Sequence, residues 1–164
     1  MRRSTGILVT LGTALALGAV TGLTKLAVAQ DTGAQATYRD IEQTLGSVPT
    51  MFKVFPEAGI AAAWAEFKSL QLNPKTRLDG RMKELIGLAV SAQIPCQYCV
   101  YFHTAAAKAN GATDEDIREA VAMAAVVRHW STVLNGMQID PATFRQETDA
   151  VLRAAGEKAK TANK

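Results

Sequence analysis

The chain has 164 residues, of which 48% are hydrophobic, and it carries 18 basic and 15 acidic side chains. The excess of basic charge comes from residues 1–29, which hold Arg2, Arg3 and Lys25 and no acid, so residues 30–164 are formally neutral. The basic character of the whole chain therefore gives no support for a nucleic-acid partner or for binding to an anionic membrane.

Residues 1–29 have the organisation of a secretory signal peptide. Arg2 and Arg3 precede an apolar stretch at residues 7–20, and the tripeptide at 27–29 (AVA) is a small-residue cleavage pattern. Such a leader predicts a periplasmic or secreted bacterial protein with no membrane contact after cleavage. The alternative is an uncleaved anchor that leaves the domain facing the periplasm, although the apolar stretch is shorter than the ~20 residues of a typical span.

The rest of the chain predicts one all-α domain. Residues 30–56 form a lead-in with short helices around Tyr38–Leu45 and Thr50–Phe55, and residues 57–155 form the main helical domain. No segment alternates apolar and polar residues between turn signals, which argues against a sheet. The Lys-rich residues 156–164 predict a disordered tail. Caps and breakers place the longer helices at Glu57–Leu72, Asp79–Ala92, Cys96–Ala109, Thr113–Leu134 and Asp140–Ala155.

The only two cysteines, Cys96 and Cys99, lie close to one of the two histidines, His103. On a helix opened by Pro95 these three residues have i, i+3 and i+7 spacing and share one face. A thiol reacts as its thiolate, and the positive end of the helix dipole favours ionisation of Cys96. The imidazole at i+4 favours Cys99 instead, so the spacing leaves open which sulfur is the nucleophile.

The helix that precedes the cysteines is joined to theirs by only a few residues. Such a short link predicts an antiparallel helical hairpin, in which residue 84 lies opposite residue 103. Glu84 is therefore expected to face His103, where its carboxylate fixes the imidazole tautomer and raises its basicity. Gly87, one turn beyond Glu84, is expected to let the two helices approach closely.

Glu84, Cys96, Cys99 and His103, together with the flanking residues 83–125, resemble the active-site signature of the alkylhydroperoxidase D (AhpD)-like branch of the carboxymuconolactone decarboxylase family. The resemblance implies an all-α, AhpD-like helical bundle whose central antiparallel hairpin carries the CxxC motif. It also implies a ring-like homo-oligomer, either a trimer or a trimer-based hexamer.

The same resemblance implies a peroxiredoxin-type antioxidant enzyme that reduces hydrogen peroxide or organic hydroperoxides. Cys99 would become a sulfenic acid and Cys96 would resolve it as a disulfide, which an unknown thiol reductant then reduces. Glu84 and His103 would relay protons, and no metal or other cofactor is expected.

Two further residues are candidates for the pocket. Tyr98 stands between the cysteines, where the best-studied members of that family carry a second histidine, and a phenol with a pKa of about 10 cannot act as a base near pH 7. His129, in the predicted helix 113–134, either lines the pocket from a neighbouring helix or subunit or is a half-buried interface histidine.

Several alternatives remain open at this point. The pair Cys96 and Cys99 also suits a dithiol–disulfide oxidoreductase or carrier in which Cys96 is the attacking sulfur. A purely structural disulfide is disfavoured because so short a loop removes little chain entropy. A zinc site is disfavoured because Cys96 and His103 lie two turns apart. Lactone decarboxylation gives the cysteines no role.

Overall fold

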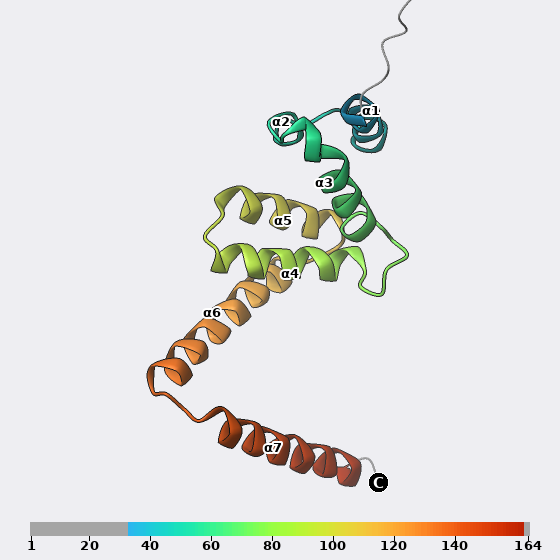
Figure 1. Cartoon of the computed structure of the whole chain (residues 1–164). Coiled ribbons are helices and arrows are strands. Elements are labelled where there is room, and N and C mark those ends of the chain that lie inside the picture. Colours follow the sequence, from blue (N-terminus) through green and yellow to red (C-terminus); the bar gives the residue numbers. More distant parts are fainter. Residues whose placement is uncertain (1–32, 163–164) are drawn as a thin grey trace, which may run out of the picture.

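The computed structural model describes residues 33–162, so the predicted leader lies outside the described part of the chain (Figure 1). Within that part all regular secondary structure is helical, which confirms the all-α prediction. None of the described helices is both long and apolar enough to cross a membrane. The helices are α1 (Gly33–Leu45), α2 (Thr50–Lys53), α3 (Glu57–Leu70), α4 (Gly80–Gln93), α5 (Gln97–Ala109), α6 (Asp114–Gly136) and α7 (Pro141–Ala162).

Helices α1, α2 and α3 form a small unit with its own apolar core. Ile41 and Ile60 are fully buried, and Trp64 packs edge-on against Phe52 at a ring-centroid distance of 5.4 Å. The indole Nε1 of Trp64 donates a hydrogen bond to Asp40 Oδ2 at 2.6 Å, so the buried ring satisfies its only polar group. These contacts join α1 to α3 and fix the direction in which α3 runs towards the hairpin.

Helices α4 and α5 form the predicted hairpin, and α6 crosses α4 (Figure 1). Asp79 caps α4 by accepting the backbone N–H of Met82 at 2.8 Å, which satisfies one of the free donors at the helix start. Leu88 on α4 is 1% exposed, and Gln93 Nε2 donates to the Ala124 carbonyl of α6 at 2.5 Å. Gly111 follows α5 with φ +86°, the left-handed conformation that glycine commonly adopts just after a helix.

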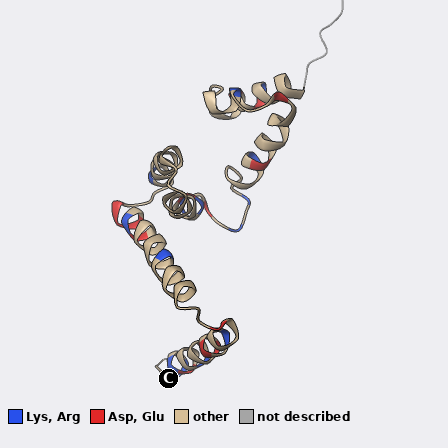
Figure 2. Cartoon of the chain, turned by 60° about the vertical axis from the view of Figure 1, so that its left-hand side comes forward, with Lys and Arg blue, Asp and Glu red and all other residues tan. Residues whose placement is uncertain are grey.

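Helix α6 begins with a capping box, in which the Thr113 and Asp116 side chains each accept the other's backbone N–H. Helix α7 then leaves the body of the molecule, as Figures 1 and 2 show, and none of its 22 residues is buried. Its exposed apolar residues are Phe144, Val151 and Leu152.

The largest differences from the expected helix ends lie at the start of α1 and the end of α7. Helix α1 begins at Gly33 rather than at Tyr38, and α7 continues to Ala162 instead of ending at Ala155. The tail predicted to be disordered from residue 156 is therefore helical as far as the structure describes it. Its alanines, lysines and glutamate are good helix formers, and a single glycine at 156 costs only about 1 kcal/mol in a helix interior.

Candidate active site

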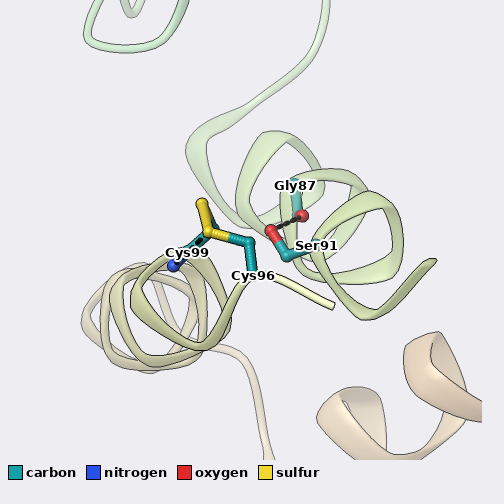
Figure 3. Close-up of a disulfide and its surroundings, with 4 residues drawn as sticks. All are labelled: Gly87, Ser91, Cys96 and Cys99. Carbon is teal, nitrogen blue, oxygen red and sulfur yellow. Dashed lines mark hydrogen bonds between the residues drawn. A yellow bond between two sulfur atoms is a disulfide. The ribbon is translucent and has the colours of Figure 1, made fainter. Parts of the chain in front are cut away.

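The two cysteines form a disulfide at the start of α5 (Figure 3). The helix was predicted to open at Pro95 with Cys96 in its first turn, but Cys96 is the N-cap, with extended backbone angles of φ −92° and ψ 96°. Its Sγ accepts the backbone N–H of Cys99 at 3.3 Å, the contact that an N-cap side chain normally makes. Only Cys99 and His103 therefore share a helical stripe, and Cys96 lies at the positive end of the helix.

Glu84 and His103 meet across the hairpin, which confirms the predicted pairing. His103 Nδ1 lies 2.7 Å from Glu84 Oε2, and the Glu84 side chain is 6% exposed. An ionised carboxylate can only accept hydrogen bonds, so opposite an ionised Glu84 it is Nδ1 that donates, which leaves Nε2 to accept a proton. The pair thus fixes the orientation of the imidazole and leaves one nitrogen for chemistry.

Gly87 makes this arrangement possible, as the sequence predicted. A Cβ at Gly87 would lie 2.8 Å from His103 Nε2 and still closer to two other ring atoms. The imidazole therefore lies directly on the backbone of α4. One turn further along, Ser91 Oγ donates to the Gly87 carbonyl at 2.6 Å (Figure 3).

Gln71, at the C-cap of α3, is a site residue that the sequence analysis missed. Its side-chain Nε2 donates to both carboxylate oxygens of Glu84, at 3.2 and 3.4 Å. It is therefore the second partner that satisfies this buried acid. No local signal marks Gln71, because its contact depends on how α3 packs against the hairpin.

A cavity of about 190 Å³ lies beside Cys99. Tyr98 lines it, as expected, and is 80% exposed. His129 does not line it: this histidine is exposed on α6, with its ring edge-on to Trp130 at 5.3 Å. The residues lining the cavity are Met51, Phe67, Gln71, Tyr98, Cys99, Phe102 and His103.

The site therefore combines the Cys96–Cys99 disulfide with the hydrogen-bonded side chains of Glu84 and His103. His103 lies one helical turn from Cys99, and both line the same cavity. Among residues 33–162, no group of three or more His, Cys, Asp or Glu side chains is placed to hold a metal ion. The chemistry that these residues can perform is thiol oxidation and disulfide exchange with proton transfer.

Comparison with known proteins agrees with this class of site. The model of the carboxymuconolactone decarboxylase family matches residues 58–140. The crystal structure of the alkylhydroperoxidase AhpD core from Rhodospirillum rubrum is similar, with a TM-score of 0.59 and 30% identity over 68% of this chain and 86% of that one. An all-helical fold with a CxxC disulfide thus defines an AhpD-like protein. The chain belongs to the carboxymuconolactone decarboxylase family.

A curated relative shares a shorter region. "Uncharacterized protein 4 in cox locus" from Paracoccus denitrificans is 43% identical over 51 residues, which are 31% of this chain and 46% of that protein. The chain thus spans less than half the length of this relative. Family membership suggests an enzyme of the alkylhydroperoxidase type.

Proposed function

We propose that this protein is an exported, thiol-dependent peroxidase that reduces hydrogen peroxide or organic hydroperoxides. The observation that carries the proposal is the position of His103, which is hydrogen-bonded to the buried Glu84 at 2.7 Å and lines the same cavity as Cys99. A histidine held in this way is suited to deprotonate a thiol one helical turn away.

In the proposed reaction the reduced Cys99 gives its proton to His103 Nε2 and attacks the terminal oxygen of the peroxide. The O–O bond breaks, Cys99 becomes a sulfenic acid, and the departing alkoxide or hydroxide takes the proton back from His103. The Cys96 thiol then attacks the sulfenic sulfur, which forms the disulfide and releases water. Two thiols are oxidised, the peroxide is reduced to an alcohol and water, and an external dithiol must reduce the disulfide for turnover.

A dithiol–disulfide oxidoreductase is the second candidate, and the N-cap position of Cys96 favours it. The backbone N–H of Cys99 and the helix dipole both stabilise a thiolate on Cys96. A stabilised thiolate is a good leaving group, so this sulfur is suited to exchange with the disulfide or dithiol of a partner.

Stopped-flow oxidation of the reduced protein by hydrogen peroxide separates the two candidates. The peroxidase predicts fast oxidation in the wild type and in Cys96→Ser, where a Cys99 sulfenic acid accumulates and reacts with dimedone, and slow oxidation in Cys99→Ser. Rates near that of free cysteine in every form, together with rapid thiol exchange that Cys96→Ser removes, would support the oxidoreductase instead.

We also propose that several copies of the chain assemble, as a homotrimer or a trimer-based hexamer. The support is the amount of apolar surface that a single copy leaves exposed. On α6, Met123 is 54% exposed and Val127 62%; on α7, Val151 is 66% and Leu152 64%. A soluble chain rarely leaves so many large apolar side chains exposed along two successive helices.

The proposed export of the protein rests on the sequence of residues 1–29. We expect the mature chain to begin at Gln30 and to be found in the periplasm or the medium, or to remain anchored facing the periplasm if the leader is not cleaved. N-terminal sequencing of the protein from fractionated cells distinguishes the two forms.

A further inference from the structure

A second and larger cavity adjoins the proposed active site. It has a volume of about 390 Å³, within the range of about 300 to 1,000 Å³ that is usual for small-molecule sites. His103 and Gln71 line both this cavity and the one at Cys99. The two cavities are therefore neighbours that share the imidazole and the amide as a common wall.

The second cavity is lined mainly by apolar surface, and two cationic residues are among its lining side chains. Leu70, Leu78 and Ile86 supply the apolar surface, and Arg77 and Lys83 supply two positive charges. Lys83 Nζ donates to the Asn73 carbonyl at 2.7 Å, which fixes the ammonium group while leaving its other two N–H donors for a ligand.

No carboxylate lines this cavity to neutralise those charges. The acids nearest along the chain have other partners, because Glu84 binds His103 and Gln71 and Asp79 caps α4. A site with apolar walls and two cations is complementary to a carbon chain that ends in an anionic group.

We propose that the second cavity binds a hydroperoxide that carries a carboxylate on an alkyl chain, with the carboxylate at Arg77 and Lys83 and the chain along Leu70, Leu78 and Ile86. The peroxide end then extends past His103 and Gln71, which line both cavities, towards Cys99. The substrate class rests on the proposed peroxidase function, whereas the binding of a carboxylated chain does not.

Binding is tested on the oxidised protein, which keeps redox chemistry out of the measurement. Calorimetric titration is done with dodecanoate and with dodecyltrimethylammonium, each below its micelle concentration. Dodecanoate is expected to bind at least ~10-fold more tightly than the cation, and Arg77→Glu to weaken it by ~10-fold or more, because a charge-assisted contact is lost. Arg153→Glu on the exposed helix α7 is the matched charge reversal and is expected to leave the affinity unchanged.

Equal affinity for the two amphiphiles, or an affinity that Arg77→Glu does not change, overturns the proposal. A cavity covered by a second copy of the chain would show no binding of dodecanoate, which overturns it as well.

A kinetic arm separates this proposal from the proposed function. With the reduced protein, Arg77→Glu is expected to slow oxidation by a carboxylated alkyl hydroperoxide by ~10-fold and to leave oxidation by hydrogen peroxide unchanged. If hydrogen peroxide fails to oxidise even the wild type while dodecanoate still binds through Arg77, the peroxidase function is wrong and the anionic-chain site stands. If Arg77→Glu slows oxidation of the protein by both peroxides equally, the proposed binding site is wrong.

Discussion

The α4–α5 hairpin and helix α7 bury their side chains to very different degrees. The hairpin buries Leu88 and even the charged Glu84, whose carboxylate is satisfied by two side chains from other helices. Helix α7 is longer than either hairpin helix but buries nothing. The hairpin holds its acid–imidazole pair with contacts from one chain, whereas α7 leaves an apolar face without a partner in that chain.

This difference separates two kinds of constraint. Glu84 and His103 of the hairpin are held by contacts that one copy supplies, so their geometry can serve chemistry. In α7 the exposed side chains of Phe144, Val151 and Leu152 have no packing partner that fixes them within one copy. We propose that another copy of the chain covers them. Substitutions in the two regions should therefore affect different properties, activity in the hairpin and assembly in α7.

The largest effect is expected from Glu84→Gln in the hairpin. An amide cannot stabilise the imidazolium that forms when His103 takes a proton, so oxidation of the reduced protein by peroxide should slow by about 10²-fold or more. Stopped-flow fluorescence measures the rate. Glu157→Gln, the same change on the exposed face of α7, should leave it within about twofold of the wild type. A normal rate for Glu84→Gln would exclude the proton relay.

The next largest effect is expected from Leu152→Asp in α7, which should disrupt assembly. A charge in an apolar interface lacks a partner, so we expect the oligomer to dissociate at micromolar concentration. Light scattering after size-exclusion chromatography gives the mass. The control Gln146→Asp adds the same charge on the opposite face of the helix and should leave the mass unchanged. A wild-type protein that is already monomeric would refute the proposed assembly.

Gly87→Ala and Gly156→Ala make the comparison sharper, since the same methyl group is added in each region. At Gly87 it meets the His103 ring, which Glu84 holds in place, so we expect a loss of about 1 to 3 kcal/mol of stability and a slower peroxide reaction. At Gly156 nothing lies within 4 Å of the added atom, so the better helix propensity of alanine should stabilise the chain by up to about 1 kcal/mol. Thermal unfolding followed by circular dichroism measures both, and equal shifts would contradict the close approach at Gly87.

The smallest effect concerns the start of α7 in acid. Hydrogen bonds from the backbone and side chain of Thr143 lower the pKa of Asp140 below its ordinary value of 3.8. A lowered pKa means that the cap stabilises the helix fully above pH 3.8 and that this contribution is lost as the pH falls through the lower, folded value. After correction for the intrinsic exchange rate at each pH, the protection of the amides at residues 142–145 should fall in that window. Asp140→Asn keeps the cap but cannot titrate, so its exchange at these residues should lack this pH-dependent step.

The sequence alone was sufficient for the parts of this protein that depend on local spacing. Caps and breakers placed the hairpin helices to within one residue, and the short link between them was enough to predict that Glu84 faces His103. This prediction was possible because a short connection leaves two helices few ways to pack.

Tertiary structure decided the rest. Gln71 joins the site only because the α1–α3 unit directs the end of α3 onto the hairpin, over contacts that no local pattern encodes. The cavity at Arg77 and Lys83 likewise forms between segments that meet only in the fold. The N-cap position of Cys96 depended on where α4 ends, with Ile94 as its C-cap, since that end sets where the next helix can start. Local spacing thus identified the candidate reactive groups, and long-range packing determined what surrounds them.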